Sequence, residues 1–275
     1  MIPRAIPLLL AVLPCLAETL SVMTFNVRFP STGDGPDVWE NRRHQLVETI
    51  REQRPDLIGT QELFHSQGEF IAAQLPEFAW FGIGRRGDRA DEHMGVFYRK
   101  DRFRVLESGN FWLSETPEVP GSSSWNMSLP RLVTWGLFEF LDTSRRFYFF
   151  NTHFPHRGQE DMASRAACAR VLAERLAKLP PDVPIVLTGD FNTGPASEPY
   201  RLLNAQLTDA WTAAATRLGP EGTFHGFRGV PGPQRIDWIL FRGPFRSLLA
   251  QTITRAENGR YPSDHFPVWA RLELK

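Results

Sequence analysis

Residues Val183–Asn192, with the sequence VPIVLTGDFN, combine an apolar strand with a polar tip. The run Val183–Thr188 is largely apolar and predicts a buried strand. Asp190 and Asn192 follow two positions apart, so in extended chain their side chains face the same side. Asp, Asn and Gly also favour turns, but a turn does not explain the apolar Phe191 between them. The stretch therefore predicts an acid–amide pair on rigid backbone, suited to orienting or deprotonating a water molecule.

Similar polar tips follow other short apolar runs along the chain. They are Thr24-Phe25-Asn26, Thr60-Gln61-Glu62, Asn151-Thr152-His153, Arg235-Ile236-Asp237-Trp238 and Ser263-Asp264-His265. Buried carboxylates and imidazoles are costly unless they are paired or bound to a metal. Taken alone, Glu62 would be interpreted as a solvated charge, and any single histidine as a structural or surface residue. Together these tips predict one site assembled from many strand ends.

The residue types in these tips indicate two chemical units. Glu62 and Asp264, with Asn26 as a supporting oxygen, form the hard oxygen set that Mg²⁺ prefers. Asp237 and His265 predict a carboxylate–imidazole pair, in which the carboxylate fixes the ring tautomer and raises its pKa. A cationic ring of this kind can neutralise a phosphate oxygen.

Composition narrows the class of protein. The chain has 275 residues, of which 42% are apolar and 23% charged, and its formal net charge is zero. These values are ordinary for a globular domain, and they give no strong field to attract nucleic acid or an anionic membrane. A His-Glu-x-x-His zinc motif and a Gly-x-Ser-x-Gly elbow are absent from the sequence. Serine-type acyl hydrolysis is therefore not expected. The stretch Gly82–Gly87 has Gly-x-Gly-x-x-Gly spacing but does not follow a clean βαβ pattern, so it is a weak signal for a nucleotide loop.

The N-terminus has the layout of a secretory signal peptide. Met1–Arg4 is a short basic start, Ala5–Leu16 is apolar, and Ala17 is a small residue at a plausible cleavage point. The apolar stretch is too short to span a membrane as a stable helix, although an uncleaved anchor is the alternative. We expect residues 1–17 to be removed and the protein to be secreted or periplasmic, without stable membrane insertion. Cys168 would then be the one remaining cysteine, and we expect it to be a small core residue.

The order of predicted elements indicates mixed sheets with helices outside. Helices are expected at Val38–Gln53, Ser66–Leu75 and Asp161–Leu179. The front half, Leu20–Thr152, and the back half, Val183–Leu274, each contain enough predicted strands for one sheet. Two sheets packed face to face would place strand ends from both halves around one cleft.

Taken together, the motifs resemble the endonuclease/exonuclease/phosphatase superfamily, which has the fold of deoxyribonuclease I and the abasic-site endonucleases. The resemblance runs from about Leu20 to Leu274. It implies a single domain over residues 18–275, built as a four-layer α/β sandwich of two mixed β-sheets packed face to face with helices outside. It also implies a Mg²⁺- or Mn²⁺-dependent phosphoesterase, in which an activated water attacks in line.

The resemblance assigns expected roles residue by residue. Glu62 would be the main metal ligand, with Asn26 and Asp264 completing the metal site; Asp190 would activate the water; Asn192 and His153 would bind the scissile phosphate; His265, held by Asp237, would stabilise the developing charge. The stretches Phe111–Pro117 and Pro130–Trp135 resemble a little-characterised bacterial branch of the superfamily. There Arg131 is a candidate for contact with substrate phosphate.

The substrate stays open between several possibilities. The zero net charge and an aromatic-rich stretch, Trp112–Trp125, favour a small or lipid-derived phosphoester. A secreted nuclease acting on DNA or RNA is the alternative. A non-catalytic binding protein on the same fold is a third, and the presence of the expected residue type at each catalytic position argues against it. We expect a monomer.

Overall fold

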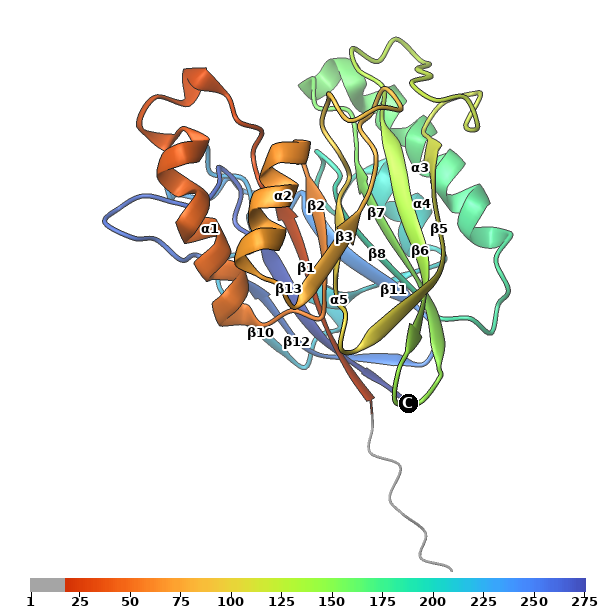
Figure 1. Cartoon of the computed structure of the whole chain (residues 1–275). Coiled ribbons are helices and arrows are strands. Elements are labelled where there is room, and N and C mark those ends of the chain that lie inside the picture. The colour runs from red at the N-terminus through yellow and green to blue at the C-terminus, as the bar shows by residue number, and fades with distance from the viewer. Residues whose placement is uncertain (1–17) are drawn as a thin grey trace, which may run out of the picture.

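The computed structural model describes residues 18–275 as two mixed β-sheets that pack face to face, with helices on their outer faces (Figure 1). The predicted signal peptide, residues 1–17, lies outside the described residues. In the part of the chain that is described, no helix is both long enough and apolar enough to cross a membrane.

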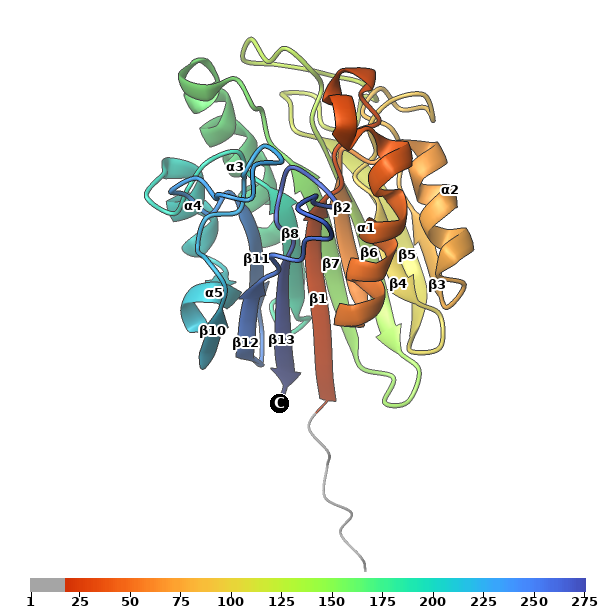
Figure 2. The same cartoon turned by 90° about the vertical axis from the view of Figure 1, so that its left-hand side faces the viewer.

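The first sheet has seven strands in the order β10-β12-β13-β1-β2-β4-β3. In that order they span Thr216–Leu218, Phe245–Thr252, Val268–Leu274, Glu18–Asn26, Leu57–Gln61, Val96–Arg99 and Phe78–Phe81. β1 runs parallel to β2 and antiparallel to β13, so the first and last strands of the fold are neighbours (Figure 2).

The second sheet has six strands in the order β5-β6-β7-β8-β11-β9. They span Phe103–Trp112, Leu132–Phe140, Arg146–His153, Ile185–Asp190, Asp237–Arg242 and Thr208–Asp209. β7 and β8 are parallel, whereas β8 and β11 are antiparallel.

Helices cover the outer face of each sheet. On the first sheet these are α1 (Trp39–Gln53) and α2 (His65–Gln74), and on the second they are α3 (Met162–Ala177) and α4 (Glu198–Asn204). The short helix α5 (Ala210–Ala213) and two 3₁₀ turns, Thr32–Asp37 and Gly158–Asp161, complete the elements. The three helices expected from the sequence are present as α1, α2 and α3.

The alternation of side chains along β1 shows how the layers are held. Leu20 and Val22 point into the core between the sheets, and Met23 and Phe25 point into the core beneath α1 and α2. Because both faces are covered, the strand is apolar on both sides, as buried strands usually are. Cys168 of α3 is buried in the core of the second sheet, as expected.

The expected division of the sheets by chain halves is wrong. β5, β6 and β7 from the front half pair with β8 and β11, whereas β12 and β13 from the back half pair with β1. The apolar pattern of a strand reveals that it is buried but not which neighbour it pairs with. The strands β3 and β12 were also not expected from the sequence.

Strand register decides where the polar tips meet. In the parallel pair β1 and β2, Asn26 lies beside Gln61, and in β7 and β8, His153 lies beside Asp190. Across the antiparallel pair, Asp190 lies opposite Asp237. The tips of both sheets therefore gather at one edge of the sandwich.

Candidate active site

Asp190, at the end of β8, lies at the centre of the site. Its Oδ2 atom accepts a hydrogen bond of 2.9 Å from Nδ2 of Asn26, which comes from the other sheet. The same oxygen is 3.4 Å from Nε2 of His153 and 3.8 Å from Nε2 of His265. All four side chains are buried, so the sequence-predicted residues of both sheets do converge.

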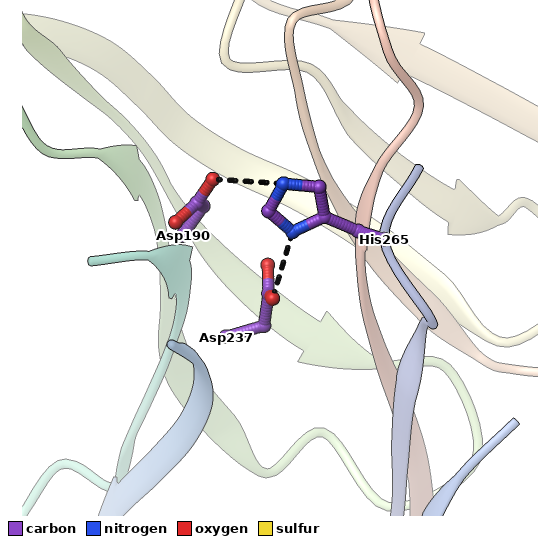
Figure 3. A group of neighbouring side chains, drawn as sticks. All are labelled: Asp190, Asp237 and His265. Carbon is purple, nitrogen blue, oxygen red and sulfur yellow. Dashed lines mark hydrogen bonds and ion pairs between the residues drawn. The ribbon is translucent and has the colours of Figure 1, made fainter. Parts of the chain in front are cut away.

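His265 and Asp237 form the predicted pair (Figure 3). The Nδ1 atom of His265 is 3.0 Å from Oδ2 of Asp237. Burial disfavours the imidazolium, but the carboxylates of Asp237 and Asp190 outweigh it and raise the pKa of His265 well above its ordinary value. The ring is therefore cationic near neutrality, and its Nε2–H is directed towards Asp190.

The surroundings of Asp190 adjust its basicity. Burial and the nearby charge of Asp237 raise the pKa of Asp190 to about 7. A carboxylate with such a pKa can take up a proton near neutral pH, which suits a general base. The backbone N–H of Asn192 donates to Oδ1 of Asp190 at 2.9 Å and fixes the carboxylate plane.

The apolar residue inside the Gly-Asp-Phe-Asn stretch has a structural role. The Phe191 ring stacks on Trp238 of β11, with 4.2 Å between ring centroids and 12° between the planes. This stack lies behind Asp190 and Asp237, the residues that precede its two members. The burial of Phe191 accounts for the apolar residue in the stretch. The strand nevertheless ends at Asp190, and Asn192 has a left-handed φ of 52°, so the expectation that Asp190 and Asn192 face the same side of an extended chain is wrong. Asp190 and Asn192 are joined instead by a local turn, because Asp and Asn favour such side-chain-to-backbone bonds.

A second acidic group lies beside the first, at the end of β2. Oε1 of Glu62 accepts from Nδ2 of Asn26 at 3.0 Å, and Oε2 accepts from the backbone N–H of Phe29 at 3.2 Å. Glu62 has a left-handed φ of 57°, an uncommon conformation for a non-glycine residue that turns its side chain into the site. Burial, and to a lesser extent the charge of Glu62, raise the pKa of Asp264.

Arg28 stands between these acids. Its guanidinium makes a two-pronged ion pair with Asp34, and it lies 3.8 Å from Glu62 and 3.9 Å from Asp264. Two neighbouring carboxylates thus share one half-buried cation. Hard, mutually repelling carboxylates of this kind are the donor set that suits Mg²⁺ or Mn²⁺.

A tighter group, Asp190, Asp237 and His265, also offers ligand atoms within 4.8 Å of one another. We favour the Glu62 and Asp264 position for a metal, because a cationic His265 has no free lone pair to give. In the present geometry Asn26 bridges the carboxylates of Glu62 and Asp190 through its amide nitrogen. Its role as a metal ligand stays a prediction.

The two expected phosphate ligands lie at the centre, and their roles stay predictions. His153 is buried, and burial together with the charge of Arg131 lowers its pKa well below the ordinary value, so the ring is neutral. Its Nδ1 atom has no partner among the described residues. Asn192 has a left-handed φ of 52° and donates from its side chain to the carbonyl of Phe154 at 3.1 Å.

Arg131, which precedes β6, lies close to this centre but is covered. Arg131 is only 3% exposed, and its Nη2 atom lies 2.9 Å from Nδ1 of His156. The sequence singled out Arg131 for a contact with phosphate. The structure directs Nη2 towards a neighbouring histidine, and the contact of Arg131 with phosphate stays a prediction.

One aromatic residue of the site was missed by the sequence analysis. Phe224 is 41% exposed, and its ring lies edge-on to His265 with 5.0 Å between centroids. It lies in a Gly- and Pro-rich loop, where nothing in the sequence distinguishes it from an ordinary surface residue. Trp112, by contrast, is 4% exposed, and its indole N–H donates to the carbonyl of Arg85. The first residue of the aromatic-rich stretch Trp112–Trp125 is therefore covered.

Several known proteins are similar to this chain in sequence and in fold. A model of the endonuclease/exonuclease/phosphatase family matches residues 23–265. The chain is similar to a solved family protein from Bacteroides thetaiotaomicron, with 33% identity, a TM-score of 0.89, and coverage of 94% of this chain and 99% of that one. It is also similar to a mannosyl-6-phosphatase from B. thetaiotaomicron VPI-5482, with 34% identity, a TM-score of 0.86, and coverage of 92% and 99%.

More distant similarities extend to eukaryotic proteins. The carbon catabolite repressor protein 4 homolog 3 of Arabidopsis thaliana is 29% identical over 60% of this chain, which corresponds to 35% of that protein. Human nocturnin is 21% identical over 68% of this chain and 46% of its own length. The chain spans only part of these curated relatives. The solved human nocturnin catalytic domain, at 18% identity, a TM-score of 0.73, and coverage of 94% of this chain and 97% of that one, shows a shared fold.

Proposed function

Because the chain belongs to the endonuclease/exonuclease/phosphatase family, we propose that it is a Mg²⁺- or Mn²⁺-dependent phosphoesterase. A water molecule activated by Asp190 attacks the phosphorus in line with the leaving group. The observation that carries this proposal is the position of the Asp190 carboxylate, within 4 Å of both His153 and His265. A base flanked by two imidazoles can accept a proton while neighbouring N–H groups face the phosphoryl oxygens.

Each residue of the candidate site has a part in this reaction. Asp190 takes the proton of the attacking water. His265, kept cationic by Asp237, stabilises negative charge as it develops on the phosphoryl oxygens. His153 and Asn192 orient the phosphoryl group against the base. Glu62 and Asp264 hold the metal, which when bound supplies charge neutralisation at the phosphoryl group.

The substrate that we propose is a small or lipid-derived phosphoester. The similarity to the mannosyl-6-phosphatase, at 34% identity over nearly the whole of both chains, supports a compact phosphorylated molecule. The zero net charge supports the same choice over duplex DNA, because phosphate contacts dominate DNA affinity. Phe224, whose ring lies against His265, adds one apolar aromatic face that a compact organic leaving group could contact.

A panel of substrates tests the proposal. The purified protein is assayed with mannose 6-phosphate, p-nitrophenyl phosphate, bis-p-nitrophenyl phosphate, sphingomyelin and plasmid DNA, with Mg²⁺, with Mn²⁺ and with chelator. We expect metal-dependent hydrolysis of a small ester and its loss in Asp190→Asn. An equal rate of hydrolysis in the presence of chelator contradicts the proposed metal dependence. Fast plasmid nicking that falls steeply with salt identifies a nuclease instead.

We also propose that the protein is exported and monomeric. The proposal of export rests on the sequence of residues 1–17. N-terminal sequencing of the protein recovered from a bacterial periplasm tests cleavage after Ala17. A sedimentation measurement of the molecular mass tests whether the protein is a monomer.

A further inference from the structure

His156 is an exposed histidine whose tautomer is fixed by a buried arginine. It follows β7, three residues after the buried His153. Nη2 of Arg131 lies 2.9 Å from Nδ1 of His156. A guanidinium has no acceptor, so Nδ1 must be the unprotonated nitrogen that accepts. The ring hydrogen is therefore on Nε2, which faces away from Arg131.

The turn that carries His156 is held by hydrogen bonds from a buried arginine. Arg165, a residue only 5% exposed, donates from Nη1 to the carbonyl of Pro155 at 3.0 Å and from Nη2 to that of Gly158 at 2.5 Å. The carbonyl of His156 itself accepts from the N–H of Gly158 at 2.8 Å. The imidazole is thus fixed through its backbone as well as through its ring.

The burial of Arg131 is costly, and the charges of Glu92, Glu62 and Asp190 offset that cost in part. Its Nε and Nη1 atoms have no hydrogen-bond partner within residues 18–275, and its bond to His156 is the hydrogen bond that the structure gives this side chain. Removing a charged group from water costs several kcal/mol on the order-of-magnitude scale. A surface loop needs no such residue to hold its shape. The one hydrogen bond given to this side chain fixes the direction of the His156 ring.

The charges around His156 keep the ring neutral. Desolvation on the side towards Arg131 and the positive charge of Arg131 lower the pKa of His156, and Arg85 acts in the same direction. Asp161 and Glu62 oppose this effect but do not overcome it. A neutral imidazole is a poor acid, so its Nε2–H donates a hydrogen bond and does not transfer a proton.

Resting on the proposed function, we propose that Nε2–H of His156 binds an oxygen of the leaving group, which identifies the substrate as the phosphoester of a hydroxylated compound such as a sugar or polyol. The scissile phosphate belongs to the buried centre at His153 and Asp190, and the leaving group extends from there towards solvent. His156 is exposed and follows His153, the last residue of β7, by three positions, and it is near enough for its charge to act on His153. We place it on that path. Arg131 is then a positioning residue that acts on the substrate through His156.

Substitutions of His156 separate the two ring nitrogens. The amide nitrogen of glutamine reaches roughly the place of Nε2, whereas that of asparagine reaches only the place of Nδ1. The variants His156→Gln, His156→Asn and His156→Ala are compared on mannose 6-phosphate and on phenyl phosphate, whose leaving group has no further hydroxyl. His44→Asn, an exposed histidine on α1, is the matched control.

We expect His156→Asn and His156→Ala to lose about tenfold in kcat/KM on mannose 6-phosphate, the usual effect of one missing hydrogen bond. His156→Gln keeps most of that activity, and phenyl phosphate hydrolysis stays within about twofold in all variants. Equal losses on both substrates, or none on either, overturn the proposal. If the wild type hydrolyses neither compound nor any other phosphoester, the proposed function fails first.

Nitrogen NMR of the histidine rings tests the part of Arg131 without an activity assay. In the wild type the His156 signals are expected to be those of the Nε2–H tautomer and to show a pKa below the ordinary value. In Arg131→Gln they should become those of a mixture, with the pKa rising. An unchanged tautomer in folded Arg131→Gln contradicts the positioning role. The His156 series stands independently if that variant does not fold.

Discussion

Nδ1 of His265 lies 3.0 Å from Oδ2 of Asp237, while the other ring nitrogen of His265 faces Asp190. The ring therefore stands between two carboxylates that belong to neighbouring strands of one sheet. Its charge depends on both of them, and so does the charge that the site presents to a phosphoryl group.

Asp237→Asn should reduce turnover by about a hundredfold, because the amide no longer stabilises the imidazolium. Metal affinity should stay nearly unchanged, since Asp237 contacts the ring and not the proposed metal position. Asp264→Ala should weaken both properties. Calorimetric titration with Mn²⁺ alongside steady-state kinetics checks this. A matching loss of Mn²⁺ binding in the two variants contradicts the assignment.

Activity should fall as the pH is lowered through about 7. Burial and Asp237 raise the pKa of Asp190 to about 7. A raised acid pKa means that the basic carboxylate is present above that pH and is lost below it. We therefore expect log kcat/KM to fall by about one unit per pH unit below 7. A flat profile from pH 5 to 8 argues against Asp190 as the base.

Glu62→Gln should raise the Mg²⁺ concentration for half-maximal activity by at least about tenfold, because a neutral amide binds a hard cation less well. Glu40→Gln on the exposed side of α1 is the control and should behave like the wild type. Activity titrated against free Mg²⁺ provides the measurement. Identical curves for Glu62→Gln and the wild type remove Glu62 from the metal site.

Phe224→Ala should raise KM for esters with a ring-shaped leaving group by about three- to tenfold, since burying one aromatic face is worth about 1 kcal/mol. Phe224→Tyr keeps the ring and should stay close to the wild type. Methyl phosphate, which has no ring, should be affected least. The comparison of KM for both kinds of ester in the wild type and the two variants shows whether Phe224 contacts the leaving group. A uniform change across the substrates points to a displaced His265.

The buried ion pair between Arg235 and Asp209 should contribute more to the free energy of unfolding than an exposed ion pair does. Nη2 of Arg235 is 2.6 Å from Oδ2 of Asp209, both side chains are fully buried, and the hydroxyl of Tyr200 also donates to Asp209. Arg235→Met leaves an unpaired buried carboxylate and should cost about 3–5 kcal/mol in the free energy of unfolding. Arg246→Met breaks an exposed pair with Glu273 and should cost at most about 1 kcal/mol. Urea unfolding of both variants measures the difference.

The chemistry of the site could be predicted from the sequence because it depends on residue types that are costly to bury. Asp190, Asp237 and His265 each follow or begin an apolar run, and their burial without pairing would be unfavourable, so their convergence was foreseeable. The strand partners were not, since an apolar strand fits beside many others. This is why the pairing of β5–β7 with β8 was missed.

The parts that could not be predicted depend on side-chain direction. Nothing in a Gly- and Pro-rich loop indicates that Phe224 leans on His265. The sequence predicts a phosphate contact for Arg131, but the direction of its Nη2 atom towards His156 follows from burial, which only the fold determines. The left-handed backbone of Glu62 is likewise a property of the end of β2 and leaves no mark in the residue pattern.

The pairing of β1 with β13 has a consequence for the time at which this protein can become active. Asn26, near the start of the fold, bonds to Asp190, and His265 is supplied just before the last strand. A chain still emerging from the ribosome carries the base but lacks the imidazolium. Competence therefore arrives only near the end of synthesis, and a chain cut before His265 should be inert even where its early strands have already paired.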